Sequence, residues 1–127
     1  MPIALERARQ EYLEQQVTSA TPERLVTMLY DRLLVDVERA EAAQIGGDAA
    51  SASTYLTHAQ AIIAELSGSL EDGWDGSDGL RALYTYLTGR LIVANVGRDV
   101  EATRECRDLI SPLRDAWHEA ADRISTV

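Results

Sequence analysis

Two histidines and one cysteine are the side chains of this sequence best suited to hold a metal ion or to act as a nucleophile. His118-Glu119 begins like the zinc-protease motif His-Glu-x-x-His, but Asp122 stands where the second histidine ligand belongs. His58 would suit a phosphorelay only with a basic neighbour, and the residues beside it supply none. Cys106 has no second cysteine with which to form a disulfide or a metal cluster, and a buried thiol is inert. The sequence therefore predicts neither a metal site nor a catalytic residue.

An acidic stretch, Asp72-Gly-Trp-Asp-Gly-Ser-Asp-Gly79, superficially resembles a calcium-binding loop. Such a loop needs oxygen ligands at its first, third and fifth positions and a glutamate at its twelfth. Counted from Asp72, the last three of these positions hold Trp74, Gly76 and Leu83. We therefore expect an acidic turn between helices, with Trp74 folded back on the protein, and no cofactor.

Four arginines could together bind a dicarboxylate, as convergent arginines do in all-helical mutases. They are Arg90, Arg104, Arg107 and Arg114. Arg104 and Arg107 fall beside an apolar helical stripe, where pairing with surface Glu or Asp is the ordinary role. A mutase therefore stays as an alternative without a motif of its own.

Composition limits the possible functions. The chain has 127 residues, enough for one domain, and 46% of them are hydrophobic. Its formal net charge of -9 opposes binding to nucleic acid and to anionic membranes. The amino-terminal residues lack the apolar stretch of a secretory signal, and no apolar run is long enough to span a bilayer. We expect a cytosolic protein without membrane insertion.

The elements that would position these side chains are all helical. Thr21-Pro22-Glu23 has the residue types of a helix start, Gly46-Gly47 those of a helix stop, and Asp48 and Asp99 are predicted N-caps. The pattern predicts helices over 3–16, 21–45, 49–70, 77–97 and 99–125. Four helices of similar length with short links favour an all-α antiparallel four-helix bundle with a short extra N-terminal helix. We predict a single domain over 1–127, made of an N-terminal segment (1–17) and the bundle (21–125).

Two predicted helices are amphipathic in the ordinary way, and two carry additional apolar residues. The helix over 21–45 has an inward stripe and also Leu25, Met28, Leu34 and Val35. The helix over 77–97 has an inward stripe and also Tyr86, Ile92, Val93 and Val96. Either the core stripe is wide with scattered exposed residues, or the surplus forms a groove for a partner helix. Tyr30, Tyr84 and Trp117 fit either the core or direct contact with a partner. We favour the core, with the tyrosine phenol groups reaching a polar partner, because buried aromatic residues more often have that role.

The same residues form an ordered set of motifs that resembles one family. Val17-Thr-Ser-Ala-Thr-Pro-Glu23, followed by Leu25-Val26 and Met28-Leu-Tyr-Asp31, is similar to the signature of the flagellar secretion chaperones, the FliS family. Leu83-Tyr84-Thr-Tyr86-Leu87, Arg90-Leu91 and Ala94-Asn95 resemble its second block, and Leu113-Arg-Asp-Ala-Trp117 its closing block. The resemblance covers nearly the whole chain.

The resemblance implies a chaperone that binds the disordered C-terminal segment of flagellin in the cytosol, blocks premature polymerisation and delivers the client to the flagellar type III export gate. It also implies that an N-terminal helix covers part of the binding surface until the client displaces it. Combined with the surplus apolar residues, it leads us to expect client contacts at Leu25, Met28, Leu29, Leu87, Leu91 and Val93. We expect Leu5, Ala8 and Tyr12 to form the cap.

Other interpretations stay open without this resemblance. A generic helical protein-interaction or regulatory bundle fits the composition and periodicity equally well. We expect a monomer or a weak homodimer and no enzymatic activity.

Overall fold

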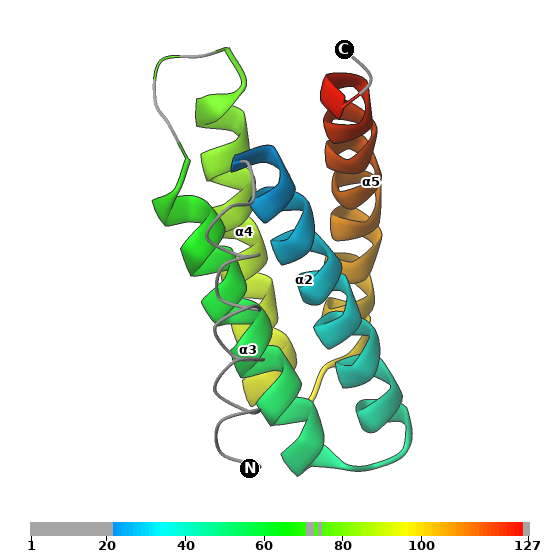
Figure 1. Ribbon diagram of the computed structural model, residues 1–127. Coiled ribbons are helices and arrows are strands. Elements are labelled where there is room, and N and C mark those ends of the chain that lie inside the picture. Colours follow the sequence, from blue (N-terminus) through cyan, green and yellow to red (C-terminus); the bar gives the residue numbers. More distant parts are fainter. Residues whose placement is uncertain (1–21, 71–72, 74, 126–127) are drawn as a thin grey trace, which may run out of the picture.

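The computed structural model describes residues 22–70, 73 and 75–125. They form helices α2 (Pro22–Ile45), α3 (Ala49–Gly68), α4 (Ser77–Val96) and α5 (Val100–Ser125), which run alternately up and down the molecule (Figure 1). The predicted all-α bundle is therefore confirmed. The predicted helix over 3–16, the cap at Thr21 and the side chain of Trp74 lie outside the described residues.

The helices form a square in which neighbours along the chain are also neighbours in space. α2 packs against α3 and α5, and α4 packs against the same two helices. α2 and α4 therefore lie on opposite corners, and on one side of the bundle α3 lies between them (Figure 1).

Helix boundaries follow the local chemistry expected from the sequence. Asp48 caps α3, since its Oδ1 accepts a hydrogen bond of 3.1 Å from the backbone N–H of Ser51. Asp99 caps α5 and accepts from the N–H groups of Glu101 at 3.0 Å and Ala102 at 3.2 Å. α3 ends at Gly68, two residues before the predicted Leu70. Ser69 is the C-cap, and its backbone N–H still donates to the carbonyl of Glu65 at 3.1 Å.

The core is a continuous apolar cluster to which all four helices contribute. Its fully or nearly fully buried members are Tyr30, Leu33, Val37, Ala40, Leu56, Ala59, Ile62, Ile63, Leu66, Tyr84, Leu87, Leu91, Ala94, Ala102, Cys106 and Ile110. Burial raises the pKa of the Cys106 thiol to about 12, so the inert role expected for it follows from its position.

Two tyrosines carry polar atoms into this core and satisfy each other. The phenol oxygens of Tyr30 and Tyr84 lie 2.7 Å apart across the bundle, so α2 and α4 are joined through its centre. The Tyr30 ring stacks on Trp117 of α5, with ring centroids 6.3 Å apart. Burial, followed by the hydrogen bond to Tyr84, raises the pKa of Tyr30. The predicted core role is confirmed for both tyrosines, and Trp117 is half-buried against the same cluster.

Within the described part of the chain, two kinds of site are missing. None of its helices combines the length and the apolar character needed to cross a membrane. Likewise, none of its His, Cys, Asp and Glu side chains gather in groups of three or more that could hold a metal ion.

Candidate protein-binding surface

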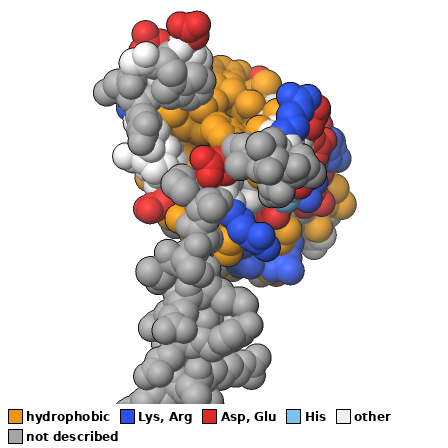
Figure 2. All heavy atoms as spheres, turned by 45° about the horizontal axis from the view of Figure 1, so that its top comes forward, with side chains coloured by type: hydrophobic (Ala, Val, Ile, Leu, Met, Phe, Trp, Pro, Cys, Tyr) orange, Lys and Arg blue, Asp and Glu red, His pale blue; other side chains and the backbone are white. Residues whose placement is uncertain are grey.

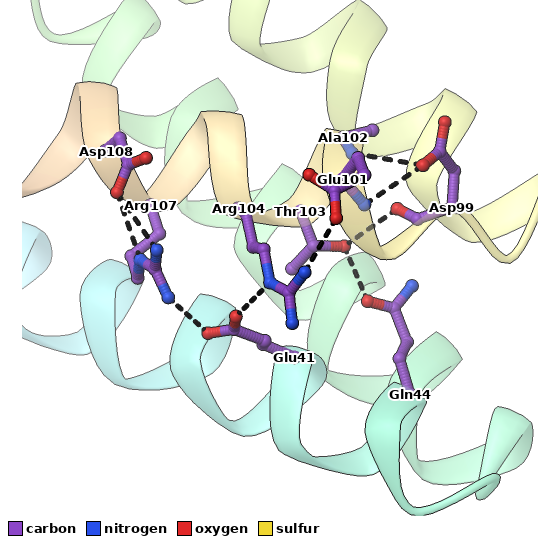
Figure 3. A network of polar contacts seen from close by, with 9 residues as sticks. All are labelled: Glu41, Gln44, Asp99, Glu101, Ala102, Thr103, Arg104, Arg107 and Asp108. Carbon is purple, nitrogen blue, oxygen red and sulfur yellow. Dashed lines mark hydrogen bonds and ion pairs between the residues drawn. The ribbon is translucent and has the colours of Figure 1, made fainter.

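Ion pairs between helices occupy the charged side of the bundle, where α2 packs against α5. Glu41 of α2 accepts hydrogen bonds from Arg104 at 2.7 Å and from Arg107 at 2.6 Å (Figure 3). These bonds, first that of Arg104, lower the pKa of Glu41. Arg104 also binds Glu101 at 2.6 Å, and Arg107 binds Asp108 at 3.1 Å. The expected surface pairing of both arginines is confirmed.

The other candidate arginines are held in the same way. Arg114 of α5 donates to Asp31 of α2 at 2.8 Å, and His118 lies 2.6 Å from the same carboxylate oxygen. Burial alone would raise the pKa of Asp31, but its hydrogen bonds to His118 and Arg114 outweigh burial and lower it. These groups are bound to carboxylates of the protein and do not converge on an open site.

Arg90, the last of the four candidate arginines, lies on α4 and pairs with a carboxylate of α5. Its Nε donates to Glu105 of α5 at 2.6 Å, and the hydroxyl of Tyr86 donates to the same carboxylate at 2.6 Å. The hydrogen bond from Tyr86, then that from Arg90, lowers the pKa of Glu105. The four arginines named for the mutase alternative are thus each paired with a carboxylate and do not converge on one site.

One buried carboxylate joins α2 to α3. Asp36 is fully buried, its Oδ2 bonds to Nδ1 of the half-exposed His58, and Arg32 lies 3.4 Å from its Oδ1. Sequence periodicity did not identify this residue, because Asp36 lies between two valines and its partner is 22 residues away. His58 therefore has a structural role, which accounts for it without phosphorelay chemistry.

The outer surfaces of α3 and α4 differ from the ion-paired side of the bundle in the charge of their exposed residues. Between Ala82 and Val96, every exposed residue of α4 is uncharged, namely Ala82, Thr85, Tyr86, Gly89, Ile92, Val93 and Val96. Between Ala50 and Ala64, the exposed residues of α3 include no Asp, Glu or Arg, being Ala50, Thr54, Thr57, His58, Ala61 and Ala64. We call these two sets together the uncharged face. It contrasts with the ion-paired seam between α2 and α5.

The exposed large hydrophobic residues mark where burial of apolar surface against a partner would be most favourable. On α4, Tyr86 is 47%, Ile92 45%, Val93 43% and Val96 82% exposed. The sequence predicts all four to be surplus apolar residues but only Val93 to be a client contact. The other three are recognisable only once the helix orientation is known.

The structure places the six expected contact residues in three different environments. Met28 and Val93 are exposed on opposite corners of the bundle, by 45% and 43%. Leu25 and Leu29 are half-buried near the start of α2. Leu87 and Leu91, in contrast, are fully buried members of the core, so we assign them to the interior in place of the partner surface. The three residues expected to form the cap, Leu5, Ala8 and Tyr12, lie outside the described residues.

Hydrophobic side chains also gather at one end of the bundle. Figure 2 brings forward the end at which α2 and α4 begin, and apolar atoms form a patch on it. Half-buried hydrophobic residues in the corresponding parts of the helices are Val26, Leu80, Leu83, Leu113 and Trp117. Leu25, Met28 and Leu29 belong to the same end of α2.

A hollow of about 660 Å³ opens at the opposite end, where α3 begins and α4 ends. Small side chains on the first turns of α3 leave this space. Its lining consists of Gln44, Gly47, Ala49, Ala50, Ala52, Ser53, Leu56, Ala94, Asn95, Val96 and Arg98. The hollow therefore adjoins the uncharged face through Ala50 and Val96.

Comparison with known proteins gives the family. Residues 5–124 match the family described as flagellar protein FliS. The flagellar secretion chaperone FliS of Bacillus subtilis (strain 168) is 31% identical over 118 residues, 93% of this chain and 89% of that protein. The flagellar secretion chaperone FliS of Escherichia coli (strain K12) is 33% identical over 111 residues, 85% of this chain and 82% of that protein.

A solved structure supports the architecture independently. A crystal structure of a bacterial flagellar chaperone superposes with a TM-score of 0.74, covering 93% of this chain and 98% of its own, at 19% identity. The fold is thus shared, while the family follows from the sequence matches. The chain belongs to the FliS family of flagellar secretion chaperones.

Proposed function

We propose that this chain is a cytosolic export chaperone that binds the disordered C-terminal segment of flagellin on its uncharged face. It prevents premature polymerisation of the client and delivers it to the flagellar type III export gate. Membership of a chaperone family makes the chain a non-enzyme. The observation that supports this choice of surface is the row of exposed apolar side chains on α4 beside the stretch of α3 from Ala50 to Ala64, whose exposed residues include no Asp, Glu or Arg.

A surface of this composition suits an amphipathic helix of the client. Apolar atoms of the client lose water against Ile92, Val93 and Val96. The one charged residue of α4 between Ala82 and Val96 is Arg90, which is partly buried and already paired with Glu105 at 2.6 Å, so no exposed charged residue of this stretch must be desolvated in return. Each half-exposed side chain that becomes fully buried contributes on the order of 1 kcal/mol. Ordering a disordered segment costs about 2–5 kcal/mol or more, so a contact of about 1,000–3,000 Å² is needed.

The positions of Met28 and Val93 favour a segment that wraps around the bundle. The two residues lie on α2 and α4, which occupy opposite corners, and towards opposite ends of the molecule. A chain crossing the small side chains of α3, such as Thr57 and Ala61, would touch both. We therefore keep Leu25, Met28 and Leu29 as proposed contacts at one end of this path and Val93 at the other.

Two valines of nearly equal exposure provide a matched test. Val93 on the uncharged face is 43% exposed, and Val35 on α2 is 38% exposed beside Arg39 and Glu38. Val93→Glu would place a carboxylate without a partner inside the contact, so we expect at least a tenfold loss of affinity for the flagellin C-terminal segment in titration calorimetry. Val35→Glu should bind like the unaltered protein.

The comparison isolates the position of the new charge, because both variants replace a valine with a glutamate. Circular dichroism should show unchanged helix content for each. Equal binding by both variants, or loss only in Val35→Glu, would place the client elsewhere and refute the proposed surface.

The N-terminal segment provides a separate part of the proposal. Leu5, Ala8 and Tyr12 are proposed to shield apolar surface while the chaperone is empty, which would lower the apparent affinity by the fraction closed. Removing residues 1–15 should then tighten binding of the flagellin segment in calorimetry. Unchanged or weaker binding would count against a cap.

A further inference from the structure

The two turns at one end of the bundle are built in the same way. In the α2–α3 turn, the N–H of Asp48 donates to the carbonyl of Ala43 at 2.8 Å, and in the α4–α5 turn the N–H of Asp99 donates to the carbonyl of Ala94 at 3.1 Å. This bond, from the residue two places beyond the helix cap back to the last turn, marks a Schellman motif in both places. In each turn the same aspartate then caps the following helix.

The two turns differ at the residue that needs a left-handed backbone. The first turn places Gly47 there, with φ 76°, and the second places Arg98, with φ 50°. Glycine adopts this conformation without steric cost, whereas a residue with a Cβ is strained. The α2–α3 turn shows that this chain builds the motif with glycine, so the α4–α5 turn retains an arginine at a cost in stability.

Arg98 also lines the hollow between these turns, as does Gly47. It is the one charged residue in that lining, which otherwise consists of small, apolar and amide side chains. Its side chain is exposed, and among the described residues no hydrogen bond or ion pair holds its guanidinium. The hollow thus combines space for a bulky apolar group with a cation at its rim.

We propose that this hollow receives a bulky apolar side chain of the client segment, while Arg98 pairs with a carboxylate beside that side chain. The inference rests on the proposed function and specifies the client chemistry at one end of the uncharged face. Guanidinium groups bind carboxylates in a planar, bidentate geometry, and partial exclusion of water by the neighbouring apolar group strengthens the pair.

The charges around the hollow favour a single carboxylate over a polyanion. Asp48 and Asp99 flank the hollow in the two turns, and the whole chain carries a net charge of -9. A phosphate chain or nucleic acid would meet these carboxylates as well as the one arginine. An isolated acidic side chain on an apolar helix meets only Arg98.

The test compares Arg98→Gly and Arg98→Gln with Arg39→Gln, which removes an exposed arginine from α2 outside the hollow. Arg98→Gly should raise Tm by a few degrees, because glycine relieves the left-handed strain. Both Arg98 variants should bind the flagellin C-terminal segment about three- to tenfold more weakly at low salt, and the difference should shrink in 0.5 M NaCl. Arg39→Gln should retain wild-type affinity.

A second pair of variants tests the hollow itself. Ala50→Trp fills the space with a side chain of the protein, and Ala116→Trp places the same group on the exposed surface of α5. We expect weaker client binding for Ala50→Trp alone. If wild-type protein binds the segment and the Arg98 and Ala50 variants bind equally well, this inference is overturned. If wild-type protein does not bind the segment, the proposed function fails first.

Discussion

Leu91→Ala is the substitution that best separates the core of this bundle from the proposed binding surface. Leu91 is fully buried among residues of all four helices, whereas Val93, two positions away on α4, is 43% exposed. Truncating a buried leucine removes apolar contacts and leaves a cavity, which costs about 2–5 kcal/mol. A domain of this size has a total stability of about 5–15 kcal/mol, so the loss is a large fraction of it.

The expected effect is readily measurable. At roughly 4 °C per kcal/mol, Leu91→Ala should lower Tm by about 8–20 °C, whereas Val93→Ala should change the free energy of unfolding by less than about 0.5 kcal/mol. Urea unfolding followed by circular dichroism gives both values. Binding of the flagellin segment, measured at a temperature where the variant is still folded, should be unchanged for Leu91→Ala.

The opposite pattern would refute this assignment. A Leu91→Ala protein with stability within about 1 kcal/mol of wild type, together with tenfold weaker client binding, would mean that Leu91 belongs to the partner surface. Leu91 would then be a client contact, as expected from the sequence, and its side chain would not be buried in solution.

Three further predictions follow from individual contacts. Hydrogen bonds from Arg104 and Arg107 lower the pKa of Glu41 in the folded state. These bonds therefore stabilise the folded protein at any pH above the pKa of an unfolded glutamate, about 4.3. The stabilisation is lost as the pH falls through the lower pKa of the folded state. Urea unfolding at pH 7 and at pH 3 should therefore show a larger loss for wild type than for Glu41→Gln, and equal losses would contradict the ion-pair account. Asp99→Ala removes two hydrogen bonds at the start of α5 and should cost about 1 kcal/mol in the same assay, with no effect expected if the cap were absent. Cys106 is fully buried, and burial raises its pKa to about 12, so a maleimide reagent should label it only under unfolding conditions; rapid labelling of native protein would argue against its place in the core.

Local signals in the sequence were sufficient for the secondary structure. Asp48 and Asp99 were identifiable as caps because capping depends on residues within one helical turn. The second turn is a partial exception. Gly97 was expected to end α4 and does so, but the left-handed backbone falls one residue later on Arg98, which no composition rule indicates.

The candidate surface was predictable only in part, because periodicity gives the width of an apolar stripe and not its direction. Leu87, Leu91 and Val93 are all apolar residues of α4, and only packing against α3 and α5 decides that the leucines face inward and the valine outward. The interior role of Asp36 depends on His58 of another helix, a contact that no local pattern contains.

Methyl-resolved NMR during a titration with the flagellin C-terminal segment tests the central claim most directly. Selective labelling of Ile, Val and Met methyl groups reports on both sides of the bundle in one experiment. We predict that the signals of Met28, Ile92, Val93 and Val96 shift on binding, whereas that of Val35 does not. Shifts at Val35 with unchanged signals from α4 would contradict the proposed client surface.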